Sequence, residues 1–283
     1  MHEEIKVWQR AVTGELCWVA PDDRPMGIPV VPLVMDDHPC VALPYLHRDV
    51  AEALREAEEV AFAVTDSASL RTEGGAGGVA VIGPARVDDD VEGDLFARDL
   101  LEQELVKHPP SRLLADSRLL RRENWWWLPR VIVRLSRASR TLRLPARTDP
   151  RRDAVLVRDG VGLRIDTVRA DDAGGWAADQ LTLRSLAGEP LRGDGGPAMA
   201  FGHTYTVPDL ERWEVWNRSG VLRGERLLVA GRVGSPDATL EPLGLLSRIR
   251  RQRDLARGCR AGIAEAAAKA GAGPATGRPR GED

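Results

Sequence analysis

His47 and Arg48 stand where a series of short apolar segments meets the start of a helical pattern. The segments begin at Gly14 and are separated by turns at 21–27 and 36–39. Backbone N–H groups and the helix dipole at such a start favour a phosphate, and the guanidinium of Arg48 can offer it two parallel donors. The alternative leaves both residues as surface groups of the first helical turn. They are the best candidates for binding an anion.

Other residues could also take part in chemistry, and each has a structural alternative. Arg71 precedes a glycine-rich loop and could add a second phosphate contact, although an exposed loop arginine is favoured. Arg130 could reach a ligand carboxylate or be a charge at a strand edge. His203 could be a residue of a second site, but a lone histidine more often has a hydrogen-bonded structural role. The tryptophans at 125–127 are expected in a strand, where alternate rings face opposite ways and favour packing over ligand contact.

Composition excludes several kinds of site. No glycine-rich loop ends in Lys-Ser or Lys-Thr, which excludes a P-loop. The histidines are too scattered to predict a metal site, and no pattern indicates a covalent nucleophile. No C-x-x-C pair occurs, so the cysteines are expected to be buried thiols: Cys17, Cys40 and Cys259.

Net charge and hydropathy limit where the protein is expected to be located and which classes of partner it is expected to bind. The net charge of −3 gives no overall attraction for nucleic acid. No apolar run reaches the length of a membrane span, and the N-terminus lacks a signal-peptide core. We therefore expect a cytoplasmic protein that acts on a small molecule, without nucleic-acid or membrane partners.

The fold class is predicted to be α+β and dominated by β-structure. The order strand, turn, strand, turn, strand, helix, strand within 14–66 is typical of a small antiparallel barrel. In the rest of the first domain, residues 1–145, we expect the following elements: a strand at 79–87, a turn at Asp88–Asp90, a helix at 93–108, a second helix capped by Ser111, a strand from the tryptophans to Arg134 and a last strand at 136–145.

A second domain follows a polar linker at 146–153. Residues 154–242 repeat features of the first domain: PCVALPYLH at 39–47 resembles PAMAFGH at 197–203, and each should precede a helix and a strand. A long helix is predicted at 243–271, with a disordered tail at 272–283. The helix is rich in arginine and could bind nucleic acid or a membrane surface, but interspersed acidic residues favour a solvated helix that packs on the barrel.

The stretch 14–66 and the sequence GGVAVIGPARVDDD at 77–90 resemble the pyridoxamine-5′-phosphate-oxidase-like, FMN-binding split-barrel superfamily. The best resemblance is to its actinobacterial branch, which uses flavin or deazaflavin F420. The resemblance implies an antiparallel split β-barrel with flanking helices. It also implies that the strands at 28–35 and 41–45 line a flavin ring. Val31, in the first of these strands, is one of the residues expected to contact the ring. The residues it places near the ribityl chain and phosphate are Pro44, Tyr45, Leu46, His47 and Arg48. The corner departs from the family because it has no serine or threonine hydroxyl at the helix cap and no lysine, and Asp49 would repel a phosphate.

The resemblance therefore implies an oxidoreductase that uses FMN or F420 to exchange a hydride with a small organic substrate. The alternative is a non-catalytic split-barrel protein that binds flavin or haem. Two related barrels in tandem would form an internal pseudo-dimer, although a homodimer is equally open. The sequence names neither the substrate nor the choice among FMN, F420 and no cofactor.

Overall fold

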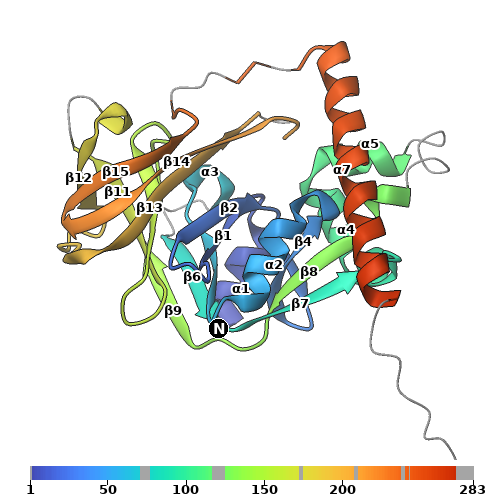
Figure 1. The fold of residues 1–283 in the computed structure, drawn as a ribbon, viewed down its shortest axis with the longest axis horizontal. Coiled ribbons are helices and arrows are strands. Elements are labelled where there is room, and N and C mark those ends of the chain that lie inside the picture. The colour runs from blue at the N-terminus through green and yellow to red at the C-terminus, as the bar shows by residue number, and fades with distance from the viewer. Residues whose placement is uncertain are drawn as a thin grey trace, which may run out of the picture.

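The computed structural model describes residues 2–70, 77–116, 125–171, 175–206, 210–236, 240–241 and 243–271. It is rich in antiparallel strands. Figure 1 shows a small barrel on the left, a long helix on the right, and a second β-structure between them. Within the described ranges, no helix has the length and hydropathy needed to cross a bilayer.

The N-terminal part of the chain forms two antiparallel sheets. The larger has the order β2-β1-β5-β6-β9, with strands Pro25–Val30, Gly14–Val19, Val60–Val64, Gly78–Gly83 and Arg140–Leu144. The smaller has the order β3-β4-β8-β7, with strands Leu33–Met35, His38–Pro44, Arg130–Leu135 and Ala85–Asp90. The chain passes from one sheet to the other at Pro32, where the predicted single strand 28–35 divides because proline cannot donate to a β-ladder.

An apolar core fills the space between these two sheets. Helix α1, His2–Arg10, contributes Trp8, whose ring meets Phe62 edge-to-face at 5.6 Å. The indole N–H of Trp8 donates to the carbonyl oxygen of Leu33 at 2.6 Å. The packing and the hydrogen bond together tie the helix to both sheets, since Phe62 and Leu33 belong to different ones.

Several predicted boundaries in this part are wrong. Asp88–Asp90 form the end of β7 and not a turn; each carboxylate has its own hydrogen-bond donor, from Arg86, Arg55 and the backbone N–H of Phe96 respectively. The predicted helix 93–108 divides into a π-helical turn, η2 (Phe96–Leu100), and α4 (Leu101–Lys107). Helix α5, Pro109–Asp116, starts on its prolines because their missing N–H groups would be unpaired in the first turn. Ser111 is therefore inside α5 and is not its cap.

The tryptophans form a short 3-10 helix, η3 (Trp125–Trp127), and not a strand. The predicted alternation of their rings is therefore wrong. Trp126 and Trp127 are 4% and 6% exposed and belong to an apolar cluster with Phe96 and Cys259. These two side chains therefore pack in the apolar core. The side chain of Trp125 lies outside the described residues.

Residues 153–233 form a closed, six-stranded antiparallel barrel, which we call the C-terminal barrel. Its order is β10-β11-β12-β15-β14-β13, with strands Asp153–Arg158, Arg164–Ala170, Gln180–Ser185, Arg226–Val233, Trp213–Gly224 and Gly193–Tyr205. A short 3-10 helix, η4 (Gly175–Ala177), brings Trp176 against Trp216 inside it, with ring centroids 4.8 Å apart. The helix expected after His203 is absent from the described residues, since β13 runs on to Tyr205 and β14 begins at Trp213.

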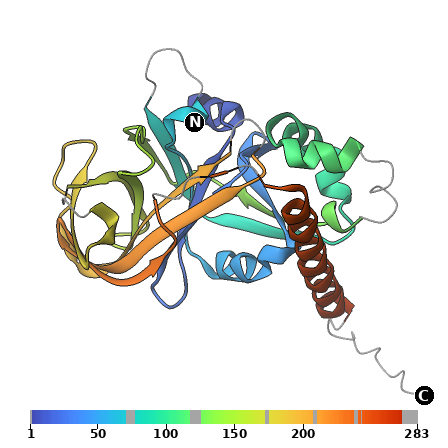
Figure 2. The same ribbon diagram turned by 90° about the horizontal axis from the view of Figure 1, so that it is seen from above.

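The N-terminal β-structure and the C-terminal barrel share an apolar interface. Side chains of β1, β5 and β6 pack on side chains of β10, β11 and β13, and Phe201 is fully buried there. Figure 2 shows β13 and β14 extending from the C-terminal barrel across the N-terminal sheets. Residues predicted as a polar linker take part as well: Arg147 is 3% exposed, and its backbone N–H donates to the carbonyl oxygen of Thr65 at 2.7 Å.

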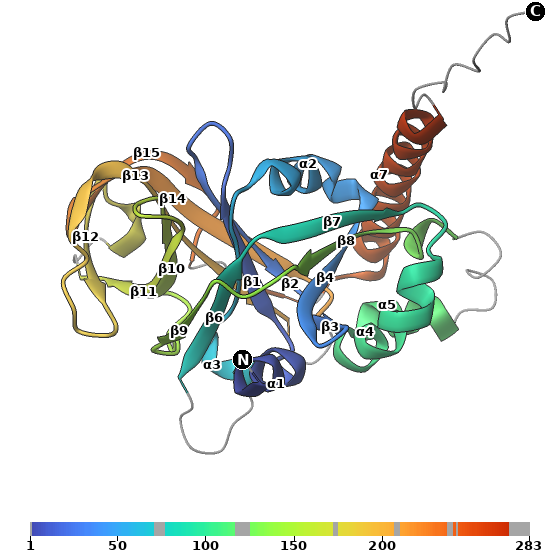
Figure 3. The ribbon, with the colours of Figure 1, turned by 90° about the horizontal axis from the view of Figure 1, so that it is seen from below.

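The C-terminal helix α7, Leu245–Gly271, packs on the N-terminal β-structure, as predicted. It covers the short 3-10 helix η1, Tyr45–His47, and the start of α2, Arg48–Glu56 (Figures 1 and 3). Two glycines allow this close approach. A Cβ at Gly258 would lie 2.3 Å from Leu46 Cδ1, and one at Gly262 would lie 2.4 Å from the carbonyl oxygen of Tyr45. The predicted tail at 272–283 lies outside the described residues.

Candidate functional site

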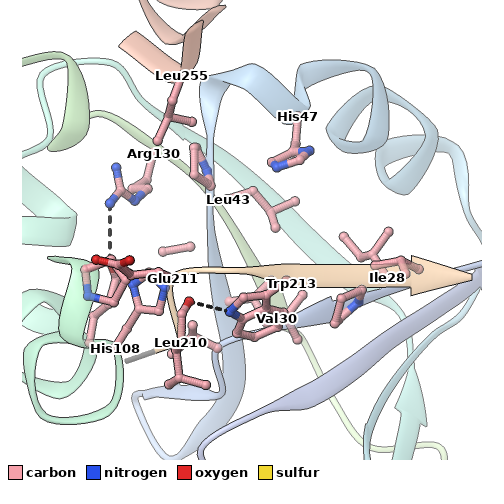
Figure 4. A pocket seen from close by; sticks show the side chains of 18 of the residues that line it. Ile28, Val30, Leu43, His47, His108, Arg130, Leu210, Glu211, Trp213 and Leu255 are labelled. Atoms are coloured by element: carbon pink, nitrogen blue, oxygen red, sulfur yellow. Dashed lines mark hydrogen bonds and ion pairs between the residues drawn. The ribbon is translucent and has the colours of Figure 1, made fainter. Parts of the chain in front are cut away.

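A cavity of about 450 Å³ lies where the N-terminal sheets, the C-terminal barrel and α7 meet (Figure 4). Strands β2 and β4 supply an apolar floor of Ile28, Val30, Val41 and Leu43, extended by Val31 and Pro44. The C-terminal barrel contributes Leu210, Glu211, Trp213 and Val215, and α7 contributes Arg251 and Leu255. The cavity therefore needs three separate parts of the chain to be complete.

Trp213 is the main aromatic side chain of the cavity wall. Its indole N–H donates to the carbonyl oxygen of Leu210 at 2.9 Å. Leu210 has a φ of +51°, a left-handed conformation that costs a non-glycine residue roughly 1–2 kcal/mol. The ring of Trp213 lies edge-on to His108, with centroids 6.4 Å apart, and nearly parallel to His203 at 6.3 Å. A strained turn and two ring contacts thus fix this wall of the cavity.

A polar network forms one end of the cavity. Ser111 donates its hydroxyl to Glu104 Oε1 at 2.5 Å, and its oxygen lies 2.9 Å from His108 Nδ1. Arg130 Nη2 reaches the same Glu104 oxygen only at 3.4 Å, and Nη1 donates to the carbonyl oxygens of Trp127 and Pro129. The guanidinium also lies 4.4 Å from the centre of the Phe96 ring. Arg130, weighed from the sequence as a strand-edge charge or a ligand contact, is buried and faces the cavity.

Burial lowers the pKa of His108 below its ordinary value. The carboxylate of Glu104 acts in the opposite direction, while the positive charges of Arg130 and Arg251 lower the pKa further. His108 is therefore a neutral imidazole at neutral pH, with one ring nitrogen that can accept and one that can donate.

The residues predicted from the sequence divide into two groups. Val31, Pro44 and His47 line the cavity, and His47 lies at the end away from Arg130 (Figure 4). Tyr45 and Leu46 do not line it. Tyr45 is buried in the core, where its hydroxyl donates to Asp89 Oδ1 at 3.2 Å. Leu46 is 46% exposed beside α7.

Arg48 also lies away from this cavity. Its guanidinium forms an ion pair with Glu265 of α7 and lies 3.6 Å from Asp49. It faces a second hollow, between α2 and α7, which contains further charges of both signs. The corner expected to hold a phosphate is therefore occupied by the protein's own carboxylate. Arg71 lies outside the described residues.

A second polar cluster is sealed between the N-terminal sheets and the C-terminal barrel. Glu15 Oε1 lies 2.6 Å from Arg147 Nη2 and 3.0 Å from His203 Nε2, and it also accepts the hydroxyl of Thr65 at 2.9 Å. The side chains of Glu15 and His203 are fully buried. This is the structural, hydrogen-bonded role that the sequence favoured for His203.

Burial alone would raise the pKa of Glu15. The charge of Arg147, together with hydrogen bonds from His203 and Thr65, more than offsets the burial and leaves the pKa below its usual range. Glu15 is therefore ionised, and the cluster is a matched set of buried charges. It joins β1, the predicted linker and β13 across the interface.

Sequence reasoning did not find Trp213, Glu104 or Ser111 as residues of one site. They come from β14, α4 and α5, and no short motif contains them. A usable signal was present at Arg130, which follows a proline at the start of an apolar strand. Its contact with Glu104, however, depends on how the helices pack.

No family model and no curated protein matches this sequence. Solved structures do match, with low scores. The haem-binding protein from Mycobacterium smegmatis has a TM-score of 0.34 and 13% identity, over 92% of this chain and 97% of that one. HutZ, the haem storage protein from Vibrio cholerae, has a TM-score of 0.35 and 13% identity, over 50% of this chain and 92% of that one.

A putative pyridoxamine 5′-phosphate oxidase from Lactobacillus delbrueckii matches with a TM-score of 0.30 and 18% identity, over 50% of this chain and 92% of that one. Because scores and identities are this low, the matches carry no argument about ligand or activity. The resemblance to the pyridoxamine-5′-phosphate-oxidase-like split-barrel superfamily therefore stays a prediction from the strand pattern.

Proposed function

We propose that the cavity between β2, β4 and Trp213 binds a planar redox cofactor, FMN, and that the protein is an oxidoreductase of the split-barrel type. F420 and haem are the alternative ligands. One observation carries the proposal: the strands that the resemblance assigns to the flavin ring are the strands that form the floor of this cavity. Its volume of about 450 Å³ is also within the range of small-molecule sites.

The lining suits a flat ring with a polar attachment. Ile28, Val30 and Leu43 offer an apolar surface from which water would be displaced, and Trp213 offers an aromatic face opposite. A bound flavin would supply the hydride chemistry, while the protein positions it and sets the electrostatics. His47 and His108 are the groups that could exchange a proton with a bound molecule.

The C-terminal barrel would act as an internal partner for the N-terminal sheets. Leu210, Trp213 and Val215 complete the wall that the N-terminal sheets leave open. A single chain would then close the site without a second copy. Such an arrangement would correspond to the internal pseudo-dimer expected from the sequence, with the closed C-terminal barrel as the second unit.

Titration with FMN tests the proposal. We expect saturable binding of one FMN per chain, followed by flavin fluorescence, and a three- to tenfold weaker affinity in Trp213→Ala, about what one aromatic contact contributes. Leu228→Ala is a matched control, because Leu228 is 38% exposed on β15 and does not line the cavity. Equal affinities in all three proteins, or no binding of FMN, F420 or haem, would contradict the site.

The non-catalytic alternative is favoured by one observation, the occupation of the Arg48 corner by Glu265. Reoxidation of the reduced, FMN-loaded protein distinguishes the two functions. An oxidoreductase should accelerate electron transfer to at least one small organic acceptor above the rate of free reduced FMN. A protein that binds FMN but accelerates no acceptor would be a carrier or a storage protein.

A further inference from the structure

One end of the cavity holds more hydrogen-bond donors than the protein satisfies. Arg130 is 5% exposed, yet its Nε has no hydrogen-bond partner among the described residues. Its contact with Glu104 is long, at 3.4 Å, because that carboxylate oxygen already accepts the hydroxyl of Ser111 at 2.5 Å. The positive charge of Arg130 is therefore only weakly paired, and its side chain lines this end of the cavity.

Two further groups line the cavity together with Arg130, namely His108 and Arg251. Because Ser111 donates its hydroxyl to Glu104, Nδ1 of the neutral His108 carries the ring proton towards Ser111, and Nε2 is left as an acceptor without a hydrogen bond to any described residue. Arg251 lines the cavity from α7 and has no ion pair within the described part of the chain. His108, Arg130 and Arg251 therefore share the lining of one cavity.

The acidic groups of this cavity are already engaged. Glu104 accepts from Ser111 and Arg130, and Glu211 lies 2.7 Å from Arg248 Nε. These two carboxylates reduce the positive electrostatic potential at this end of the cavity, but neither forms an ion pair with Arg251 among the described residues. Arg48, by contrast, is neutralised by Glu265 and lies outside the lining of this cavity.

We propose that Arg130 and Arg251 form the subsite for an anionic group of the ligand, a phosphate or a carboxylate. The inference rests on the proposed function and deepens it, because it orients the ligand in the cavity. Its anionic group lies at the end opposite His47, and Arg48 does not hold it. Two guanidinium groups suit a phosphate or carboxylate, which each can bind through two parallel hydrogen bonds.

The anionic group could belong to the cofactor or to a substrate, and FMN and riboflavin distinguish these sources because only FMN has a phosphate. The affinities are measured for the unaltered protein, Arg251→Gln and the matched control Arg48→Gln. If the cofactor phosphate binds here, Arg251→Gln weakens FMN binding about tenfold or more and leaves riboflavin binding within about twofold. Arg48→Gln should leave both within about twofold.

If Arg251→Gln leaves FMN binding unchanged, the flavin-loaded protein is titrated with benzoate, which tests whether a substrate carboxylate binds here. A perturbation of the bound flavin spectrum by benzoate that is lost in Arg251→Gln supports the subsite, with a substrate carboxylate as its ligand. The inference is overturned if neither FMN nor benzoate affinity depends on Arg251, or if Arg48→Gln weakens FMN binding as much as Arg251→Gln does.

A protein that binds no flavin would refute the proposed function but not the subsite. Calorimetric titration with inorganic pyrophosphate then decides. Binding that is weakened about tenfold in Arg251→Gln, and not in Arg48→Gln, keeps the anion subsite. The absence of pyrophosphate binding, or binding that is equal in both variants, overturns it. Circular dichroism of each variant checks that the fold is retained.

Discussion

Two polar clusters lie where the N-terminal sheets meet the C-terminal barrel, and they are built differently. In the sealed cluster, Glu15 is within 3.0 Å of both Arg147 and His203, and the side chains of Glu15 and His203 are fully buried. In the cavity cluster, Glu104 and Arg130 are separated by 3.4 Å. Each cluster leaves one buried nitrogen unpaired among the described residues, Nδ1 of His203 and Nε of Arg130, so the length of the ion pair distinguishes them. A short, sealed ion pair is typical of a structural joint. The longer pair borders the cavity that we propose as a binding site, and the ring of His203 against Trp213 connects the two clusters.

The largest expected effect tests the sealed cluster. Glu15→Gln should lower the free energy of unfolding by roughly 3–5 kcal/mol, because Arg147 becomes a buried charge without a counterion. Glu104→Gln should cost only about 1–2 kcal/mol, since its contact with Arg130 is long and borders a cavity. Urea unfolding measures both. Equal losses would show that the two clusters do not differ in kind.

The next effect tests how α7 closes the site. Gly262→Ala places a methyl group 2.4 Å from the carbonyl oxygen of Tyr45, so the helix must shift at a cost of about 1–3 kcal/mol. The control is Gly244→Ala, where a Cβ would meet no atom within 4 Å. Thermal unfolding and limited proteolysis within 245–271 report the change. An undisturbed Gly262→Ala protein would mean that α7 is not held against η1.

The smallest effect tests the protonation state of the cavity cluster. The pKa of His108 in the folded protein is below the ordinary value of 6.5, so the unfolded chain binds a proton that the folded protein does not. Stability should therefore fall as the pH decreases through about 6.5 and towards the lower folded pKa. Urea unfolding from pH 7 to 5 should show that the free energy of unfolding decreases less in His108→Gln than in the unaltered protein as the pH falls. Parallel curves would contradict a neutral, buried His108.

The sequence predicted the parts of the fold that depend on local pattern. The strands β1, β4 and β5, the helix α2 and the long helix α7 follow from apolar alternation, turn residues and helical periodicity. The predictions failed where packing decides. The tryptophans at 125–127 have strand propensity but form a 3-10 turn beneath α7. Arg147 lies in a segment with the polar composition of a linker, but it is buried and forms an ion pair with Glu15 of β1.

Sequence reasoning located only part of the cavity lining for the same reason, and cofactor binding by these residues stays a prediction. Val31, Pro44 and His47 lie on strands or corners that the local pattern locates, and they do line the cavity. Arg48 was placed near a phosphate because it begins a helix, but a residue more than 200 positions later, Glu265, pairs with it. No local pattern in a single sequence predicts a contact between such distant residues.

The crystal structure of the protein with FMN tests the central claim most directly. The account predicts the isoalloxazine ring between the apolar floor of β2 and β4 and the indole of Trp213, with the phosphate towards Arg130 and Arg251. An FMN bound elsewhere on the protein, with this cavity unchanged, would contradict it.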